Sequence, residues 1–193
     1  MNDKKLSIVI MAAGRGTRMN SELPKVLHHL SGETLLNHVI ATAEQLSPEN
    51  IVTVVGYEAQ MVQDSVNNSD ILFSIQKDQK GTGHAVLQTQ NHLESFDGNT
   101  LVLSGDVPLI SRNTLYSLVE KHESNNFNAT MLTAEINNPT GYGRVIRDNK
   151  NNLKYVCEHK DCDEEELKVK EINSGIYVFD NKLLFELLLF SHI

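Results

Sequence analysis

Apolar runs of strand length alternate with segments of helical period along the first two thirds of the chain. Runs of mostly β-branched residues and leucine are typical of strands buried on both faces, and they cover residues 6–11, 51–55, 71–75 and 100–104. Apolar residues at i, i+3 and i+4 spacing predict helices over residues 34–46, 59–66 and 82–93. A further helix is predicted over residues 111–122, because Pro108 ends the strand before it and Ser111 is a good N-cap. This alternation predicts an α/β fold with a Rossmann-like, mostly parallel sheet flanked by helices.

The pattern changes after the last of these helices. Strand-like segments separated by turn residues follow one another over residues 129–136, 143–148, 153–158 and 171–180. The acidic run "DCDEEE" at 161–166 is interpreted as a solvated loop or the start of a helix. With 193 residues, of which 40% are hydrophobic, the chain is long enough for one domain with its own core. We therefore expect a single domain over residues 1–193 with a β-rich second half.

The charge distribution narrows the class of ligand. A net charge of -8 argues against a general nucleic-acid binder, which would present a basic face. Residues 1–30, however, carry five basic and two acidic side chains, and this local excess suits a small anionic ligand. No run approaches the roughly 18–20 apolar residues of a membrane span, and "LLFELLLF" near the end is broken by Glu186. We expect neither a nucleic-acid nor a membrane partner.

Two cysteines, Cys157 and Cys162, lie close together in the second half. Together with His159 they could contribute to a zinc site, but the usual paired spacing and a fourth ligand are missing. We interpret them as reduced structural thiols, which fits a reducing, cytoplasmic location.

Glycines and cations follow the first predicted strand, where open α/β sheets bind ligands. Gly14 and Gly16 allow the backbone to turn and bring its amides close to an anion, and Arg15, Arg18 and Lys25 add positive charge. This segment fits neither the dinucleotide fingerprint nor the Walker A pattern. Taken alone, it fits a surface loop with solvated cations equally well.

The position of Lys25 depends on the proline before it. Pro24 disfavours helical backbone at Leu23, so Lys25 is predicted on a loop from which it can reach a phosphate site.

Six motifs in order resemble the sugar-nucleotide pyrophosphorylases, with details similar to the bacterial N-acetylglucosamine-1-phosphate uridylyltransferases of the GlmU type. The first, "MAAGRGTRM…LPKVL", resembles the pattern L-A-A-G-x-G-T-R-M…L-P-K. The others are "QKDQKGTGHAV" (76–86), "GDVPLI" (105–110), "NPTGYGRVIRD" (138–148), "CEHKD" (157–161) and "EINSGIYVF" (171–179). The resemblance covers nearly the whole chain and implies the nucleotide-diphospho-sugar transferase type of α/β fold.

The resemblance implies a transfer reaction between two polyanions. A phosphate oxygen of N-acetylglucosamine-1-phosphate would attack the α-phosphorus of UTP, giving UDP-N-acetylglucosamine, a peptidoglycan precursor, and pyrophosphate. Such catalysis rests on positioning and charge neutralisation, with Mg²⁺ as the implied cofactor. Two alternatives stay open: another sugar-1-phosphate nucleotidyltransferase, for example one acting on glucose-1-phosphate, or a catalytically weak UDP-sugar-binding domain.

The resemblance also assigns roles to particular residues. It implies catalytic roles for Arg18, Lys25 and Asp106, with Asp106 as the Mg²⁺ ligand. The implied nucleotide-binding residues are Met11, Ala12, Ala13, Gly14, Gly16, Thr17, Lys25, Gln76, Gly81 and Thr82. The implied sugar-binding residues are Ser104, Gly105, Gly141, Glu158 and Asn173. Without the resemblance, Asp106 would be interpreted as a turn former, and Gln76 and Glu158 as exposed polar residues. His84 is interpreted as a structural residue.

The chain departs from the family pattern at three positions and in length. Met11, Arg15 and Ser104 replace the usual Leu, Lys and Tyr, and Ser104 thereby loses an aromatic wall beside the nucleotide. The sequence ends before the asparagine that is the second Mg²⁺ ligand of the family and before its acetyltransferase β-helix. We therefore expect a C-terminally incomplete nucleotidyltransferase domain that is monomeric and has no acetyltransferase activity. Nucleotide binding is expected more firmly than turnover.

Overall fold

The computed structural model describes residues 4–16, 19 and 21–190. Two compact units make up the chain: Met1–Thr130 together with Tyr177–Ile193, and Met131–Ile176. The expectation of one incomplete nucleotidyltransferase domain stays a prediction.

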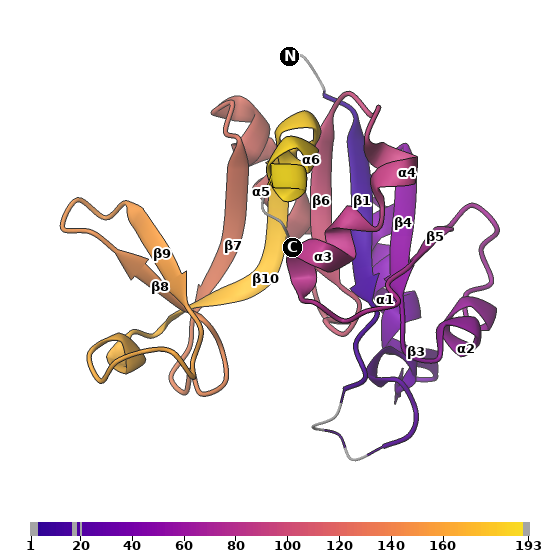
Figure 1. Cartoon of the computed structure of the whole chain (residues 1–193), viewed down its shortest axis with the longest axis horizontal. Helices are drawn as coiled ribbons and strands as arrows, with labels where there is room; N and C mark the ends of the chain where they lie inside the picture. Colours follow the sequence, from indigo (N-terminus) through magenta and orange to yellow (C-terminus); the bar gives the residue numbers. More distant parts are fainter. Residues whose placement is uncertain (1–3, 17–18, 20, 191–193) are drawn as a thin grey trace. The chain divides into compact units, whose positions relative to one another are not determined.

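A parallel sheet forms the centre of the first unit (Figure 1). Strand β1 (Leu6–Ala12) pairs in parallel with β4 (Asn50–Val55) on one side and with β6 (Asn99–Ser104) on the other. Strand β5 (Leu72–Ile75) pairs in parallel with β4, and the end of β10 (Glu171–Asp180) pairs antiparallel with β6. The four strands predicted for the first half and their parallel arrangement are confirmed.

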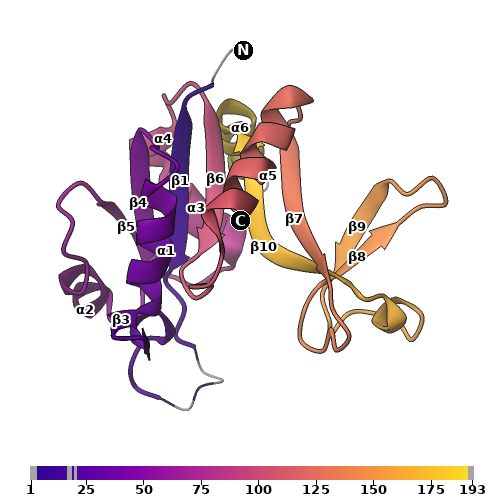
Figure 2. The same cartoon turned by 180° about the vertical axis from the view of Figure 1, so that it is seen from behind.

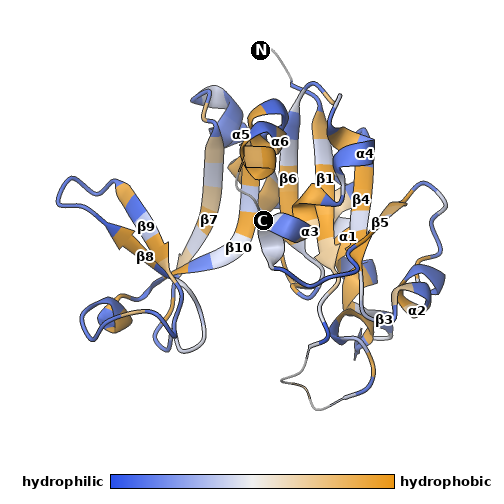
Figure 3. Cartoon of the chain, in the orientation of Figure 1, coloured by the Kyte–Doolittle hydropathy of each residue, from blue (hydrophilic) through white to orange (hydrophobic). Residues whose placement is uncertain are grey.

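The strands are apolar on both faces because helices cover both. Ile8, Val9 and Ile10 in β1 and Val52 in β4 are completely buried, and the hydrophobic colouring follows these strands in Figure 3. Continuous β-branched runs of this kind are expected where a sheet is covered on each side.

Helices pack on the two faces of this sheet. Figure 2 shows α1 and α5 on one face, and Figure 1 shows α3, α4 and α6 on the other. Their bounds, with that of the short α2, are α1 Leu35–Glu44, α2 Ala59–Asp64, α3 Thr82–Leu87, α4 Gln90–Leu93, α5 Arg112–Ser124 and α6 Asn181–Phe190. Local caps define where α1 and α5 begin, since the hydroxyl oxygens of Thr34 and Ser111 accept backbone N–H groups three residues ahead, at 3.1 Å each.

The structure differs from the sequence prediction at one helix. The segment predicted as a single helix over 82–93 forms α3 and α4, which are separated near Thr89. The Thr89 hydroxyl is buried and donates to the carbonyl of Val86 at 2.7 Å, which offers the backbone an alternative to the regular helical pattern. The spacing of apolar residues gives no sign of this break, because α3 and α4 both present their apolar residues to the same sheet.

Short elements that the sequence analysis did not predict also occur. These are the 3₁₀ helix η2 (Lys25–Leu27), the hairpin of β2 (His29–Leu30) and β3 (Glu33–Thr34), and the helix α6 at the apolar run near the end.

A buried asparagine ties α6 to the sheet. The Asn181 side chain is fully buried, and its Oδ1 accepts from the Thr100 hydroxyl of β6 at 2.7 Å. Its Nδ2 donates to the carbonyls of Leu93 and Phe96 at 2.7 and 2.8 Å. All the polar contacts that this amide makes are internal, so its loss would remove three hydrogen bonds and leave the buried Thr100 hydroxyl without this partner.

The second unit is built from antiparallel strands. Strands β8 (Arg144–Arg147) and β9 (Leu153–Cys157) form a hairpin, and β8 pairs with the first part of β10 through Arg144 and Ile172. Strand β7 (Ala129–Glu135) also pairs with β10, and the 3₁₀ helix η3 (Glu166–Lys168) follows β9. The β-rich second half is confirmed. In the part of the chain that the structure describes, no helix has the length and apolar character needed to cross a membrane.

Candidate active site

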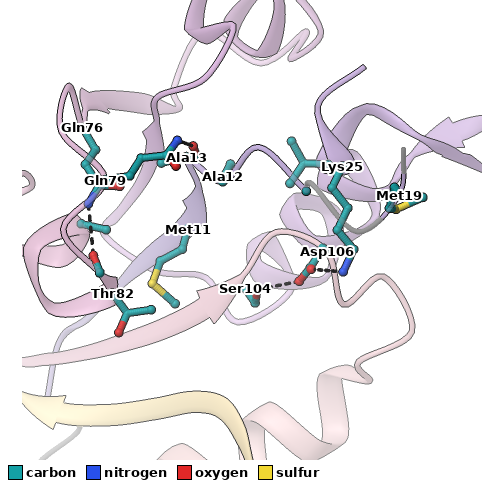
Figure 4. Close-up of a pocket in the computed structure, with 15 residues that line it drawn as sticks. Met11, Ala12, Ala13, Met19, Lys25, Gln76, Gln79, Thr82, Ser104 and Asp106 are labelled. Carbon is teal, nitrogen blue, oxygen red and sulfur yellow. Dashed lines mark hydrogen bonds and ion pairs between the residues drawn. The ribbon is translucent and has the colours of Figure 1, made fainter. Parts of the chain in front are cut away.

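A cavity of about 460 Å³ opens in the first unit at the carboxyl ends of β1, β5 and β6 (Figure 4). Carboxyl ends of parallel strands are where open α/β sheets place their ligands. The cavity is lined by Met11, Ala12, Ala13, Gly14, Gly16, Met19, Lys25, Val26, Gln76, Gln79, Gly81, Thr82, Ala85, Ser104 and Asp106.

The backbone after β1 is fixed from outside the loop. The carbonyl of Ala13 accepts the side-chain amide of Gln79 at 2.8 Å and the backbone N–H of Tyr57 at 3.2 Å. The guanidinium of Arg15 lies over the Tyr57 ring, 4.7 Å from its centroid. These contacts hold the chain in place just before Gly14, where the predicted phosphate-binding backbone begins.

Gly16 is required by both conformation and space. Its φ is +66°, in the left-handed region that favours glycine. A Cβ added there would lie 2.6 Å from the Cβ of Lys25, closer than two carbons can pack. The glycine therefore allows Lys25 to pass directly over the loop.

Lys25 and Asp106 form an ion pair on one side of the cavity. The Lys25 Nζ donates to Asp106 Oδ2 at 2.5 Å, and the Ser104 hydroxyl donates to Oδ1 at 2.6 Å (Figure 4). Burial alone would raise the pKa of Asp106, but the hydrogen bonds from Lys25 and Ser104 outweigh it and hold that pKa below its ordinary value. The carboxyl group is therefore an anion at neutral pH, beside a fixed cation.

The prediction that Lys25 lies on a loop is wrong, because Lys25 begins η2. Pro24 occupies the N-cap position with φ of -48°, and its carbonyl accepts the N–H of Leu27 at 2.9 Å, which closes a single 3₁₀ turn. Proline is well suited to a helix start because its φ is already helical and its missing N–H is not needed there. Lys25 still lines the cavity from this position.

A second polar group lies across the cavity from the ion pair. Gln76 directly follows β5 and is 4% exposed. Its Nε2 donates to the carbonyl of Gly81 at 3.1 Å and lies 3.0 Å from Nδ1 of His84. Figure 4 shows Gln76, Gln79 and Thr82 on one side, with Met11 between them and the group of Lys25, Ser104 and Asp106. His84 contacts the amide that lines the cavity, in agreement with a structural role.

The structure brings most of the predicted site residues together. Those that line the cavity are Met11, Ala12, Ala13, Gly14, Gly16, Lys25, Gln76, Gly81, Thr82, Ser104 and Asp106. Gly105 lies against Met11, because its N–H donates to the Met11 carbonyl at 2.9 Å and an added Cβ would be 3.1 Å from that oxygen. Thr17 and Arg18 lie outside the described residues.

The remaining predicted sugar-binding residues belong to the second unit. The Asn173 N–H donates to the carbonyl of Gly143 at 3.0 Å, and a Cβ added at Gly143 would lie 3.4 Å from a carboxylate oxygen of Glu158. Gly141 has a φ of +85°, which favours glycine. The roles of these residues stay predictions.

Sequence analysis missed four residues that line the cavity: Met19, Val26, Gln79 and Ala85. Gln79 could have been found, because it lies within the motif "QKDQKGTGHAV". A polar residue in a loop, however, does not show by itself which backbone group it will contact. Val26 and Ala85 are buried, and nothing in an apolar pattern separates residues that border a cavity from those of the core.

The geometry suits a polyanionic ligand. A glycine-containing backbone, a lysine and an ionised carboxylate with a hydroxyl beside it meet at the carboxyl edge of a parallel sheet. The family of the MobA-like NTP transferase domain matches residues 8–159. The chain is a member of this family.

Comparison with individual proteins agrees with membership of the MobA-like NTP transferase family. "Bifunctional protein GlmU" of Streptococcus uberis is 48% identical over 180 residues, which are 93% of this chain and 39% of that protein. The chain thus spans about two fifths of the length of this relative. The resemblance to GlmU-type proteins seen in the motifs is confirmed.

Solved structures show the same fold at low identity. Apo-UDP-glucose pyrophosphorylase aligns with a TM-score of 0.77 at 17% identity, over 97% of this chain and 80% of the other. A putative glucose-1-phosphate thymidylyltransferase from Bacillus anthracis aligns with a TM-score of 0.74 at 18% identity, over 93% and 73% of the two chains. The α/β fold of the nucleotide-diphospho-sugar transferase type is confirmed.

Proposed function

We propose that this MobA-like domain transfers a uridylyl group from UTP to N-acetylglucosamine-1-phosphate, releasing pyrophosphate. The observation that carries the proposal is the ion pair of Lys25 and Asp106, which borders a cavity lined by the glycine-containing loop after β1. The motifs of GlmU-type uridylyltransferases and the 48% identity to a protein of that name support this substrate pair. The proposal covers one reaction and no acetyltransferase activity.

The nucleotide would bind along the β1 loop. Backbone amides around Gly14 and Gly16 would bind the triphosphate, since positive φ and missing side chains bring N–H groups close to an anion. Gln76 and Gly81 lie together across the cavity, and the glutamine amide has both the donor and the acceptor needed to recognise uracil. Thr82 begins α3 beside them and would complete this part of the site.

The reacting phosphates would lie near Lys25. In this displacement the phosphate oxygen of the sugar substrate forms a bond to the α-phosphorus of UTP, and the bond to the pyrophosphate oxygen breaks. Negative charge accumulates on the departing pyrophosphate, and a cation held in place neutralises it without rearrangement. Lys25 is held by Asp106 at 2.5 Å, and we propose the same neutralising role for Arg18.

Asp106 has the chemistry of a magnesium ligand. Mg²⁺ prefers hard oxygen donors and is commonly held by one or two carboxylates together with phosphates and water. Asp106 is anionic at neutral pH and has a hydroxyl oxygen, that of Ser104, at 2.6 Å. When bound, Mg²⁺ would supply further charge neutralisation at the phosphates.

The family motifs assign sugar-phosphate binding to five residues. Ser104 is the last residue of β6 and Gly105 follows it, both in the first unit, whereas Gly141, Glu158 and Asn173 belong to the second. The family motifs at these positions support the assignment. Cytoplasmic location, a monomeric state and a role in peptidoglycan precursor synthesis stay predictions.

Pyrophosphate release from UTP and N-acetylglucosamine-1-phosphate with Mg²⁺ tests the proposal. We expect release by the wild type, its loss in Asp106→Ala, and no change in Asp70→Asn, an exposed aspartate on the loop before β5. Faster release with glucose-1-phosphate or with another nucleoside triphosphate would favour the other sugar-1-phosphate nucleotidyltransferases. Binding of UDP-N-acetylglucosamine without release in any combination would favour the catalytically weak binding domain.

A further inference from the structure

Two thiols and a carboxylate meet in the second unit, at residues that the proposed reaction does not use. Cys157 is the last residue of β9, Cys162 lies in the turn that follows, and Glu166 begins η3. The two sulfurs and one carboxylate oxygen all lie within 4.8 Å of one another. This spacing is short enough for three ligands of a single metal ion.

The carboxylate is held in place by other residues. The Tyr155 hydroxyl donates to Glu166 Oε1 at 2.5 Å, and the backbone N–H of Asp163 donates to Oε2 at 2.8 Å. The Cys157 thiol contacts the same Oε2 at 3.4 Å. Carboxylates that bind metals are commonly fixed by such outer hydrogen bonds, which set the direction of their lone pairs.

The turn between the cysteines is also well defined. The carbonyl of Glu158 accepts the backbone N–H groups of Asp161 and Cys162 at 2.8 and 3.1 Å. Asp163 Oδ1 accepts the N–H groups of Glu165 and Glu166 at 2.9 and 2.8 Å, which brings η3 back toward β9. The three candidate ligands are therefore gathered before any ion binds, which lowers the ordering cost of binding.

The donor types select among metals. Two sulfurs and one oxygen suit Zn²⁺, which binds cysteine and carboxylate ligands tetrahedrally, whereas Mg²⁺ and Ca²⁺ require oxygen ligands throughout. We propose that Cys157, Cys162 and Glu166 form a Zn²⁺ site with its fourth position open to water. From the sequence, only Cys157, His159 and Cys162 came into question as ligands, and the cysteines were interpreted as structural thiols. Glu166 gave no signal because it lies in an acidic run that is typical of a solvated loop.

The site lies on the segment that carries a predicted sugar-binding residue. Glu158 directly follows Cys157, and its backbone carbonyl accepts the N–H of Cys162, so a metal joining the two cysteines would clamp the turn around Glu158. The cation would act on the backbone of this turn and would take no part in the transfer chemistry.

Zn²⁺ binding to the reduced 193-residue chain tests the proposal directly. In competition with a chromogenic chelator, we expect one Zn²⁺ per chain, and affinity reduced by about tenfold or more in Cys157→Ser, Cys162→Ser and Glu166→Gln. Glu165→Gln is the matched control, because this neighbouring carboxylate is exposed and pairs with Lys168. It should bind Zn²⁺ like the wild type.

Spectroscopy of the wild type keeps the test independent of variants that fail to fold. Co²⁺ in place of Zn²⁺ should give the absorption of tetrahedral cobalt with thiolate charge transfer, and Zn²⁺ should abolish it. The proposal is overturned if the reduced chain binds no Zn²⁺, or if the Co²⁺ spectrum shows six oxygen or nitrogen ligands. Unchanged affinity in both cysteine variants, or a disulfide that forms equally with and without Zn²⁺, overturns it as well.

Discussion

Replacing Gly16 by alanine tests whether the β1 loop and the lysine that crosses it form one unit. The substitution adds a single methyl group at a φ of +66° and 2.6 Å from the Lys25 Cβ. A side chain in this backbone region costs roughly 1–2 kcal/mol. Overpacking against a neighbour that cannot withdraw costs roughly 1–3 kcal/mol.

The two terms together predict a loss of about 2–5 kcal/mol in the free energy of unfolding. For a chain of this size that loss corresponds to a melting temperature lower by roughly 4–20 °C. The atom that the new methyl group meets is the Cβ of Lys25, next to the backbone, so relief of the clash must move Lys25 away from Asp106. Pyrophosphate release should therefore fall together with stability.

Two other glycines separate the contributions. Gly32 has a φ of +95° but open space around an added Cβ, so Gly32→Ala should show the backbone cost alone, about 1–2 kcal/mol, with unchanged pyrophosphate release. Gly14 has neither a positive φ nor an atom within 4 Å of an added Cβ, and Gly14→Ala should stay close to the wild type in stability. The measurements are thermal unfolding and the pyrophosphate assay on each variant.

A Gly16→Ala variant that is no less stable than Gly32→Ala and releases pyrophosphate at the wild-type rate would contradict a clash with Lys25. That result would show that the loop relaxes without moving Lys25.

Three further predictions concern single side chains. The pKa of Asp106 is lowered from 3.8, so its ionised carboxylate stabilises the folded state above that pH. The difference in the free energy of unfolding between the wild type and Asp106→Asn, measured in urea, should stay constant between about pH 8 and pH 5 and shrink on further acidification. Gln79→Ala removes the 2.8 Å bond to the Ala13 carbonyl, so the KM for UTP should rise about fivefold, the equivalent of about 1 kcal/mol, and an unchanged KM would contradict the positioning role. Asn181→Ala removes three internal hydrogen bonds, including that of the buried Thr100 hydroxyl, and should cost about 3 kcal/mol in urea unfolding, whereas exposed Lys182→Ala should cost little.

Local patterns predicted the elements of this protein well where side chains repeat with a fixed period. The β-branched runs of β1 and β4 could only be buried strands, and the caps at Thr34 and Ser111 are decided by residues three positions apart. The motif after the first strand identified Gly14 and Gly16 as candidate anion-binding residues, because backbone freedom is a property of glycine itself. The same patterns missed the break at Thr89, where one buried hydroxyl bonds back to the chain.

Tertiary structure decided which distant side chains meet. From the sequence, only the family resemblance placed Lys25 and Asp106 in one site. They are 81 positions apart, and the packing of the sheet brings them together. The carbonyl that Gln79 contacts and the thiols that Glu166 approaches are likewise set by strand order and turn geometry. Composition and periodicity record how each residue relates to its near neighbours, whereas a binding site depends on contacts between segments, which exist only after the chain has packed.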